Sequence, residues 1–196
     1  MNYLAHLYLA GDDPGLVLGS LLGDFVKGRL EGQYDEPVIR GIRLHRHVDT
    51  FTDSHPVPRA SRNRFAPPWR RFAGVIVDVC YDHFLARHWP RFADTPLDEF
   101  SSGVYGILRD NHQRLPPRLQ VFAPRLIHGH LLGSYRDLEG VERALRRLSR
   151  RLRRPVDLSL AMGQVQSRYA GLEADFLQFF PEVVRRARAW RAAAAK

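Results

Sequence analysis

Two acidic residues lie four positions apart in a stretch that is otherwise apolar almost all round. In residues 69–88, Asp78 and Asp82 fall on the same side of a predicted helix whose other faces carry side chains such as Ile76 and Phe84. Two buried, unpaired carboxylates at this spacing would repel each other. A divalent cation would relieve that cost, and so would two arginines. We favour the cation, and a second segment strengthens this interpretation.

That second segment, residues 38–56, carries an imidazole and a carboxylate on its inward side. Val38, Ile42, His45, Asp49 and Thr52 recur at spacings of four, three, four and three, which places them on one stripe of a helix. His45 and Asp49 therefore point where apolar side chains point. Imidazole and carboxylate ligands together suit Mn, Fe, Zn or Mg, and carboxylate-rich sets favour Mn and Mg.

Three further residues could join such a site. His6 stands in the apolar segment NYLAHLYLA, Asp24 follows the apolar segment GLVLGSLLG, and Asp53 lies along the edge of the His45 stripe. An acid at the end of a buried helix can also simply face solvent. Histidines and acids gathered from several helices around a metal are one way to build a phosphohydrolase, because the metal lowers the pKa of water and polarises the phosphoryl oxygen. Basic residues would hold the remaining phosphate charge.

The elements that must position these residues are predicted to be helices throughout. Apolar residues recur with helical period between Gly and Pro breaks, and the alternation typical of strands is scarce. Residues 158–180 are predicted to form one long helix that Pro181 ends or kinks. No Gly/Ser linker divides the chain, so residues 1–196 are expected to form a single all-α domain, a compact helical bundle.

Composition narrows the possible partners and surroundings. The formal net charge of +9, much of it in RALRRLSRRLRRP at 143–155, favours an acidic partner, although a solvated helix face explains the run equally well. No apolar run approaches the roughly 20 residues of a membrane span, and no basic stretch precedes the N-terminal apolar segment as in a secretory signal. Cys80 is the single cysteine and cannot form an internal disulfide, which favours the cytoplasm.

Five blocks of the chain resemble the acyl carrier protein phosphodiesterase family. They are MNYLAHLYLA, LLGDFVKG, GIRLHRHVDTFTDSHP, DVCYDHFLARHW and LEADFLQFFPEVV, in this order from residue 1 to about residue 184. The resemblance implies an all-helical relative of the HD phosphohydrolases that depends on a divalent metal, typically manganese. It further implies hydrolysis of the phosphodiester between 4'-phosphopantetheine and a serine of holo acyl carrier protein, which leaves the apo protein.

The resemblance also assigns roles to individual residues. The family's "DF" block contains Asp24, its "H-x-x-x-D" block His45 and Asp49, and its "D-x-x-x-D-H" block Asp78, Asp82 and His83. These six, followed by His6, are the implied metal ligands, and His83 or a neighbouring carboxylate could act as general acid or base. His83 lies on the opposite side of its helix from Asp78. Family members can have histidine at positions 8 and 43, where this chain has Tyr8 and Arg43.

Four basic residues close in sequence to these ligands are predicted to hold the phosphate or the acidic carrier protein: Lys27, Arg29, Arg43 and Arg46. Attraction between this basic chain and an acidic substrate should weaken with salt. One alternative is an HD-like hydrolase of nucleotides or other small phosphodiesters. A second is a helical nucleic-acid-binding protein that uses the arginines of 143–154, but that face lacks interleaved aromatic residues and leaves the buried acids unexplained.

Overall fold

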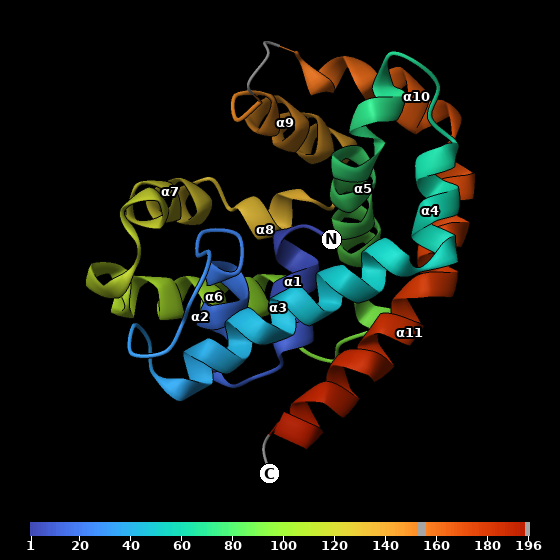
Figure 1. Cartoon of the computed structure of the whole chain (residues 1–196). Helices are drawn as coiled ribbons and strands as arrows, with labels where there is room; N and C mark the ends of the chain where they lie inside the picture. Colours follow the sequence, from blue (N-terminus) through green and yellow to red (C-terminus); the bar gives the residue numbers. More distant parts are fainter. Residues whose placement is uncertain (153–155, 195–196) are drawn as a thin grey trace.

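The computed structural model describes residues 1–152 and 156–194, and within them the prediction of an all-α fold is confirmed. This part of the chain contains no strand (Figure 1). The α-helices are α1 (Tyr3–Ala10), α2 (Pro14–Leu22), α3 (Glu36–Ser54), α4 (Pro56–Asn63), α5 (Ala73–Arg87), α6 (Leu97–Asp110), α7 (Pro117–His128), α8 (Leu131–Ser134), α9 (Leu138–Ser149), α10 (Met162–Ser167) and α11 (Tyr169–Ala194). Four short 3-10 helices, η1 (Trp69–Phe72), η2 (Trp89–Arg91), η3 (His112–Arg114) and η4 (Leu158–Ala161), complete them.

The short helix α1 lies in the middle of the bundle. It contacts α2, α3, α5 and α11, and every residue of α1 except Tyr8 is buried. This follows from its sequence, YLAHLYLA, which offers apolar side chains on all faces. His6, the one ionisable imidazole in that sequence, is therefore carried into the interior of the protein.

Helices α2 and α3 pack closely because glycines face each other at their crossing. A Cβ atom on Gly19 would overlap the carbonyl oxygen of Val38, and one on Gly41 would overlap the carbonyl oxygen of Leu16. This close approach brings the C-terminal end of α2 against the middle of α3.

The predicted inward stripe of α3 is confirmed. Val38, Ile42, His45 and Thr52 are buried, and Asp49 is half-buried with 42% of its side chain exposed. The next acid, Asp53, is 77% exposed and forms an ion pair with Arg62 at 3.1 Å. The stripe thus leaves the interior between Asp49 and Asp53.

The prediction of a single helix over 158–180 that ends or kinks at Pro181 is wrong in its bounds. The structure has η4, then α10, then α11, which continues past Pro181 to Ala194. Pro181 lacks the N–H that would bond the carbonyl of Leu177, but its neighbours Phe179 and Phe180 are fully buried. Packing of this aromatic face outweighs the one missing hydrogen bond.

Within the described part of the chain, no helix is both long enough and apolar enough to cross a membrane.

Candidate metal centre

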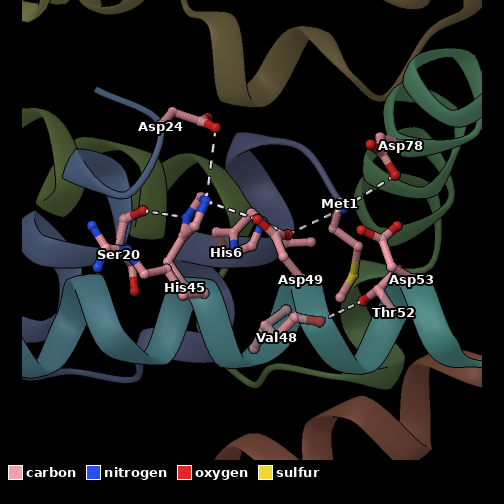
Figure 2. Close-up of polar contacts among 12 residues, drawn as sticks. Met1, His6, Ser20, Asp24, His45, Val48, Asp49, Thr52, Asp53 and Asp78 are labelled. Atoms are coloured by element: carbon pink, nitrogen blue, oxygen red, sulfur yellow. Dashed lines mark hydrogen bonds and ion pairs between the residues drawn. The ribbon is translucent and has the colours of Figure 1, made fainter. Parts of the chain in front are cut away.

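Helices α1 and α3 bring together three side chains that could hold a metal ion. One nitrogen of His6, one nitrogen of His45 and one carboxylate oxygen of Asp49 all lie within 4.8 Å of one another. Figure 2 shows His45 and Asp49 rising from the same side of α3 towards His6. We call these three residues the cluster.

His45 is held with one particular nitrogen towards the cluster. Its Nδ1 lies 2.8 Å from the carbonyl oxygen of Ser20 (Figure 2). Because a carbonyl can only accept, Nδ1 carries a proton, and Nε2 is the nitrogen turned towards the cluster. Nε2 lies 3.1 Å from Asp49 Oδ2 and 3.7 Å from Asp24 Oδ1. A backbone carbonyl that fixes the tautomer in this way is typical of metal-ligating histidines.

His6 is buried, and its ring nitrogens lack hydrogen-bond partners among the described residues. Its ring stacks on that of His45 at a centroid distance of 3.8 Å, and its Nε2 lies 3.1 Å from Asp49 Oδ1. Neither nitrogen makes a hydrogen bond with a residue in the described part of the chain. Burial, and then the neighbouring His45, lower the pKa of His6 to about 4, so the ring is neutral at pH 7. A neutral, buried imidazole with no hydrogen bond is costly unless a ligand such as a metal ion occupies its lone pair.

Asp49 supplies the negative charge. Burial acts to raise its pKa, but the contacts with the imidazoles of His45 and His6 outweigh burial and hold the pKa well below its usual value. Each carboxylate oxygen faces one imidazole. Two imidazole nitrogens and an ionised carboxylate form a donor set that suits Mn, Fe or Zn, so the residues present fit a divalent metal.

Two predicted acids border the cluster. Asp24 follows the end of α2, and its half-exposed carboxylate faces His45 Nε2 across 3.7 Å. On the opposite side Asp78 of α5 lies 3.1 Å from the amino nitrogen of Met1, which is itself 3.9 Å from Asp49 Oδ1 (Figure 2). Asp78 is 38% exposed and is thus less buried than its apolar helix predicted.

The structure does not bring Asp82 to the cluster. Its fully buried carboxylate accepts hydrogen bonds from the backbone N–H of Leu4 at 2.7 Å and of Ala5 at 3.1 Å. These are free N–H groups of the first turn of α1, whose own N-cap residue Asn2 makes no capping bond. Asp82 thus caps α1 from another helix. The sequence predicted that either a divalent cation or arginines would neutralise Asp82. Neither applies, because no arginine in the described residues pairs with Asp82 and the cluster does not include it.

His83 is also separate from the cluster. Its Nδ1 donates to the carbonyl oxygen of Tyr135 at 2.7 Å, so its Nε2 accepts the hydroxyl hydrogen of Tyr169 at 2.8 Å. Both ring nitrogens are therefore engaged, one with the residue that follows α8 and the other with the first residue of α11. His83 does face a second pocket, of about 420 Å³, lined by Arg87 and Arg136 among others.

The four basic residues predicted to hold the substrate differ in their availability. Arg43 pairs with Glu31 at 3.1 Å and with Glu36 at 3.7 Å, and Arg29 pairs with Glu31 at 3.6 Å. Arg46 donates to the carbonyl oxygen of Val26 at 3.3 Å, and Lys27 is exposed. Much of the charge of Arg29 and Arg43 is thus neutralised locally.

A different set of arginines, which the ligand-based reasoning missed, borders Asp24. They come from α7, from the end of α9 and from the two residues after it, and they line one groove. The signal was present as the basic run at 143–155, of which 153–155 lie outside the described residues, but only the fold shows that Arg147, Arg150 and Arg151 lie beside Asp24.

Gly23, at the end of α2, allows the ring of His45 to lie where it does. A Cβ atom on Gly23 would overlap Cγ of His45. We expect Gly23→Ala to displace the ring and weaken divalent-metal affinity about tenfold or more, the usual effect of disturbing a ligand's support. Titration calorimetry with Mn²⁺ would measure this. Gly103→Ala is the matched control, because its added Cβ would meet no atom within 4 Å beyond its chain neighbours and the backbone of its own helix. Equal affinities in the two variants would contradict the prediction.

Comparisons with known proteins confirm the resemblance that the sequence blocks predicted. The family model for acyl carrier protein phosphodiesterase matches residues 1–183. Proteins of that name from Pectobacterium atrosepticum and Serratia proteamaculans are each 36% identical to this chain, over 189 and 195 residues, covering 96% of this chain and 98% of the relative. No solved structure matches, so the likeness to HD phosphohydrolases stays a prediction. The chain belongs to the acyl carrier protein phosphodiesterase family.

Proposed function

We propose that this protein is a metal-dependent phosphodiesterase that hydrolyses 4'-phosphopantetheine from the serine of holo acyl carrier protein and leaves the apo protein. Family membership supports the reaction class and the carrier protein as substrate. The observation that carries the metal dependence is the cluster, in which two imidazoles and a carboxylate converge and both ring nitrogens of His6 lack hydrogen bonds within the described residues.

His6, His45 and Asp49 would hold the ion, with Mn²⁺ the first to test. A divalent ion bound there supplies Lewis acidity to a phosphoryl oxygen and lowers the pKa of water. The chain's own residues do the rest. Ser20 keeps Nε2 of His45 directed into the site, and Asp49 contributes the charge that retains a cation.

Asp24 is the carboxylate placed to handle protons at the edge of this site. It lies 3.7 Å from His45, and 45% of its side chain is exposed, so it can meet both substrate and solvent. We assign it the role of accepting a proton from the attacking water. The water's oxygen bonds to phosphorus, the bond from phosphorus to the serine oxygen breaks, and the serine oxygen takes up the proton that Asp24 accepted.

The test is turnover of holo acyl carrier protein. Protein stripped with a chelator should leave the carrier protein unchanged, and protein resupplied with Mn²⁺ should remove one phosphopantetheine from it, as mass spectrometry would show. Loss of the group without added metal would contradict the metal dependence. An unchanged carrier protein with Mn²⁺, Mg²⁺ and Zn²⁺ would contradict the named substrate. Turnover of free nucleotides or other small phosphodiesters would then favour the small-substrate alternative.

A further inference from the structure

A groove with a volume of about 840 Å³ opens beside Asp24. Its lining residues belong to the start of the loop after α2, to α7, to the end of α9 and to the two residues that follow α9. Figure 1 shows where these helices lie. Among the described residues, five arginines line it, namely Arg118, Arg125, Arg147, Arg150 and Arg151. Asp24 is the one carboxylate among its lining residues. We call it the arginine groove.

The guanidinium groups in the arginine groove are not neutralised as those of Arg29 and Arg43 are. None of the groove's arginines forms an ion pair with a carboxylate in the described part of the chain, whereas neighbouring Arg146 pairs with Glu142. Nε and Nη2 of Arg147 are buried and make no hydrogen bond with a described residue. Donors that remain unpaired in this way favour binding of an anionic ligand.

Apolar side chains lie among these arginines. Phe122 packs against Phe25 at a ring distance of 6.2 Å, and the guanidinium of Arg151 lies 5.2 Å from the centroid of Phe122. Arg151 also donates to the hydroxyl of Tyr3 at 3.0 Å, which fixes its position. On the rim, Val121 is 63% exposed, an unusual exposure for a large apolar side chain in this protein. The groove therefore matches a ligand that combines negative charge with apolar surface.

We propose that an acidic, partly apolar surface of the protein substrate docks in the arginine groove. The inference rests on the proposed function and names where its substrate binds. Five guanidinium groups and about 840 Å³ exceed what a single phosphate requires. An acidic helix with exposed apolar residues satisfies both the arginines and the apolar lining. Because Asp24 belongs to the groove and lies 3.7 Å from His45, a protein seated there carries its phosphodiester directly to the cluster.

The test reverses charge in the groove. Arg125 and Arg118 are exposed on α7, so Arg125→Glu and the double variant Arg118→Glu/Arg125→Glu should fold normally, which circular dichroism would check. Arg59→Glu, on α4 outside the groove, changes the net charge as much as Arg125→Glu does and serves as the matched control for that single variant. Two quantities would be measured: anisotropy of labelled apo acyl carrier protein on metal-free enzyme, and kcat and KM with holo acyl carrier protein.

We expect Arg125→Glu to weaken binding and raise KM about tenfold, with kcat within about twofold, and the double variant to lose more. The dependence of KM on salt should become shallower in both, and not in Arg59→Glu. Metal-dependent hydrolysis of bis(p-nitrophenyl) phosphate should be unchanged in all three. A parallel loss with this small diester would overturn protein docking in favour of a phosphate subsite.

The measurements separate this inference from the proposed function. If the carrier protein binds in a way that depends on Arg125 but is not turned over, docking in the arginine groove is supported and the proposed reaction is overturned. If turnover is insensitive to Arg125→Glu, the proposed reaction is supported and docking in the arginine groove is overturned. If the carrier protein neither binds nor reacts with the unaltered protein, both are wrong.

Discussion

Asp49→Asn is expected to reduce metal-dependent phosphodiester hydrolysis by about three orders of magnitude, roughly 4 kcal/mol in the activation free energy. Asp49 is the ionised group of the cluster, and its two oxygens each face one imidazole. The amide keeps the shape but removes the negative charge that retains a cation beside the two imidazole rings. Steady-state kinetics and Mn²⁺ titration of the purified variant would measure both losses.

The chain offers matched controls on the same helix. Asp53→Asn makes the same chemical change one turn further on, where the side chain is 77% exposed and pairs with Arg62, and should leave activity within about twofold. His45→Ala and His47→Ala form a second pair, since the ring of His47 contacts Arg186 and Trp190 and not the cluster. Loss of metal affinity in His47→Ala as large as in His45→Ala would rule out the cluster as the metal site.

Asp82→Ala is expected to lower the free energy of unfolding by about 3 kcal/mol. The change removes two buried hydrogen bonds to Leu4 and Ala5 and leaves their N–H groups unpaired in the interior. Asp13→Ala is a graded comparison, because Asp13 also caps a helix, by accepting from Gly15 and Leu16, but on the surface. About 1 kcal/mol is expected there. Urea unfolding would compare the two, and equal losses would contradict a buried capping role.

The conservative change Asp82→Asn distinguishes a cap from a metal ligand. We expect Mn²⁺ affinity to stay within about threefold of the unaltered protein, because the structure places Asp82 on α1 and outside the cluster. A hundredfold loss of Mn²⁺ affinity would instead support the metal-ligand role that the sequence resemblance implied for Asp82.

Asp82 also predicts a pH dependence of stability. Burial raises its pKa from 3.8 to about 7, so between these values the folded state holds a proton that the unfolded chain releases. The stabilisation of the folded state by this bound proton is fully present at low pH and is lost as the pH rises from about 4 to about 7. The unaltered protein should therefore lose stability relative to Asp82→Asn over that range. Unfolding curves at pH 4.5 and 7.5 would check the sign, and a difference that does not change with pH would contradict it.

The sequence by itself determined the helical fold and the inward stripe of α3. A period of 3.6 residues is a local property, so Val38, Ile42, His45 and Thr52 could be placed on one buried face without knowledge of their neighbours. The same reasoning found the buried run around Asp78 and Asp82. It could not tell what each acid faces, because that depends on which helix packs against it.

Tertiary structure alone decided which of these residues meet. His6, last among the predicted ligands, joins the cluster because α1 lies at the centre of the bundle against α3. Asp82 turns to the unpaired N–H groups of α1, since a buried carboxylate needs partners and that helix lacks a local cap. The arginines beside Asp24 come from α7 and α9, far along the chain from α2. Local periodicity fixes the face on which a side chain lies, and long-range packing fixes what that face contacts.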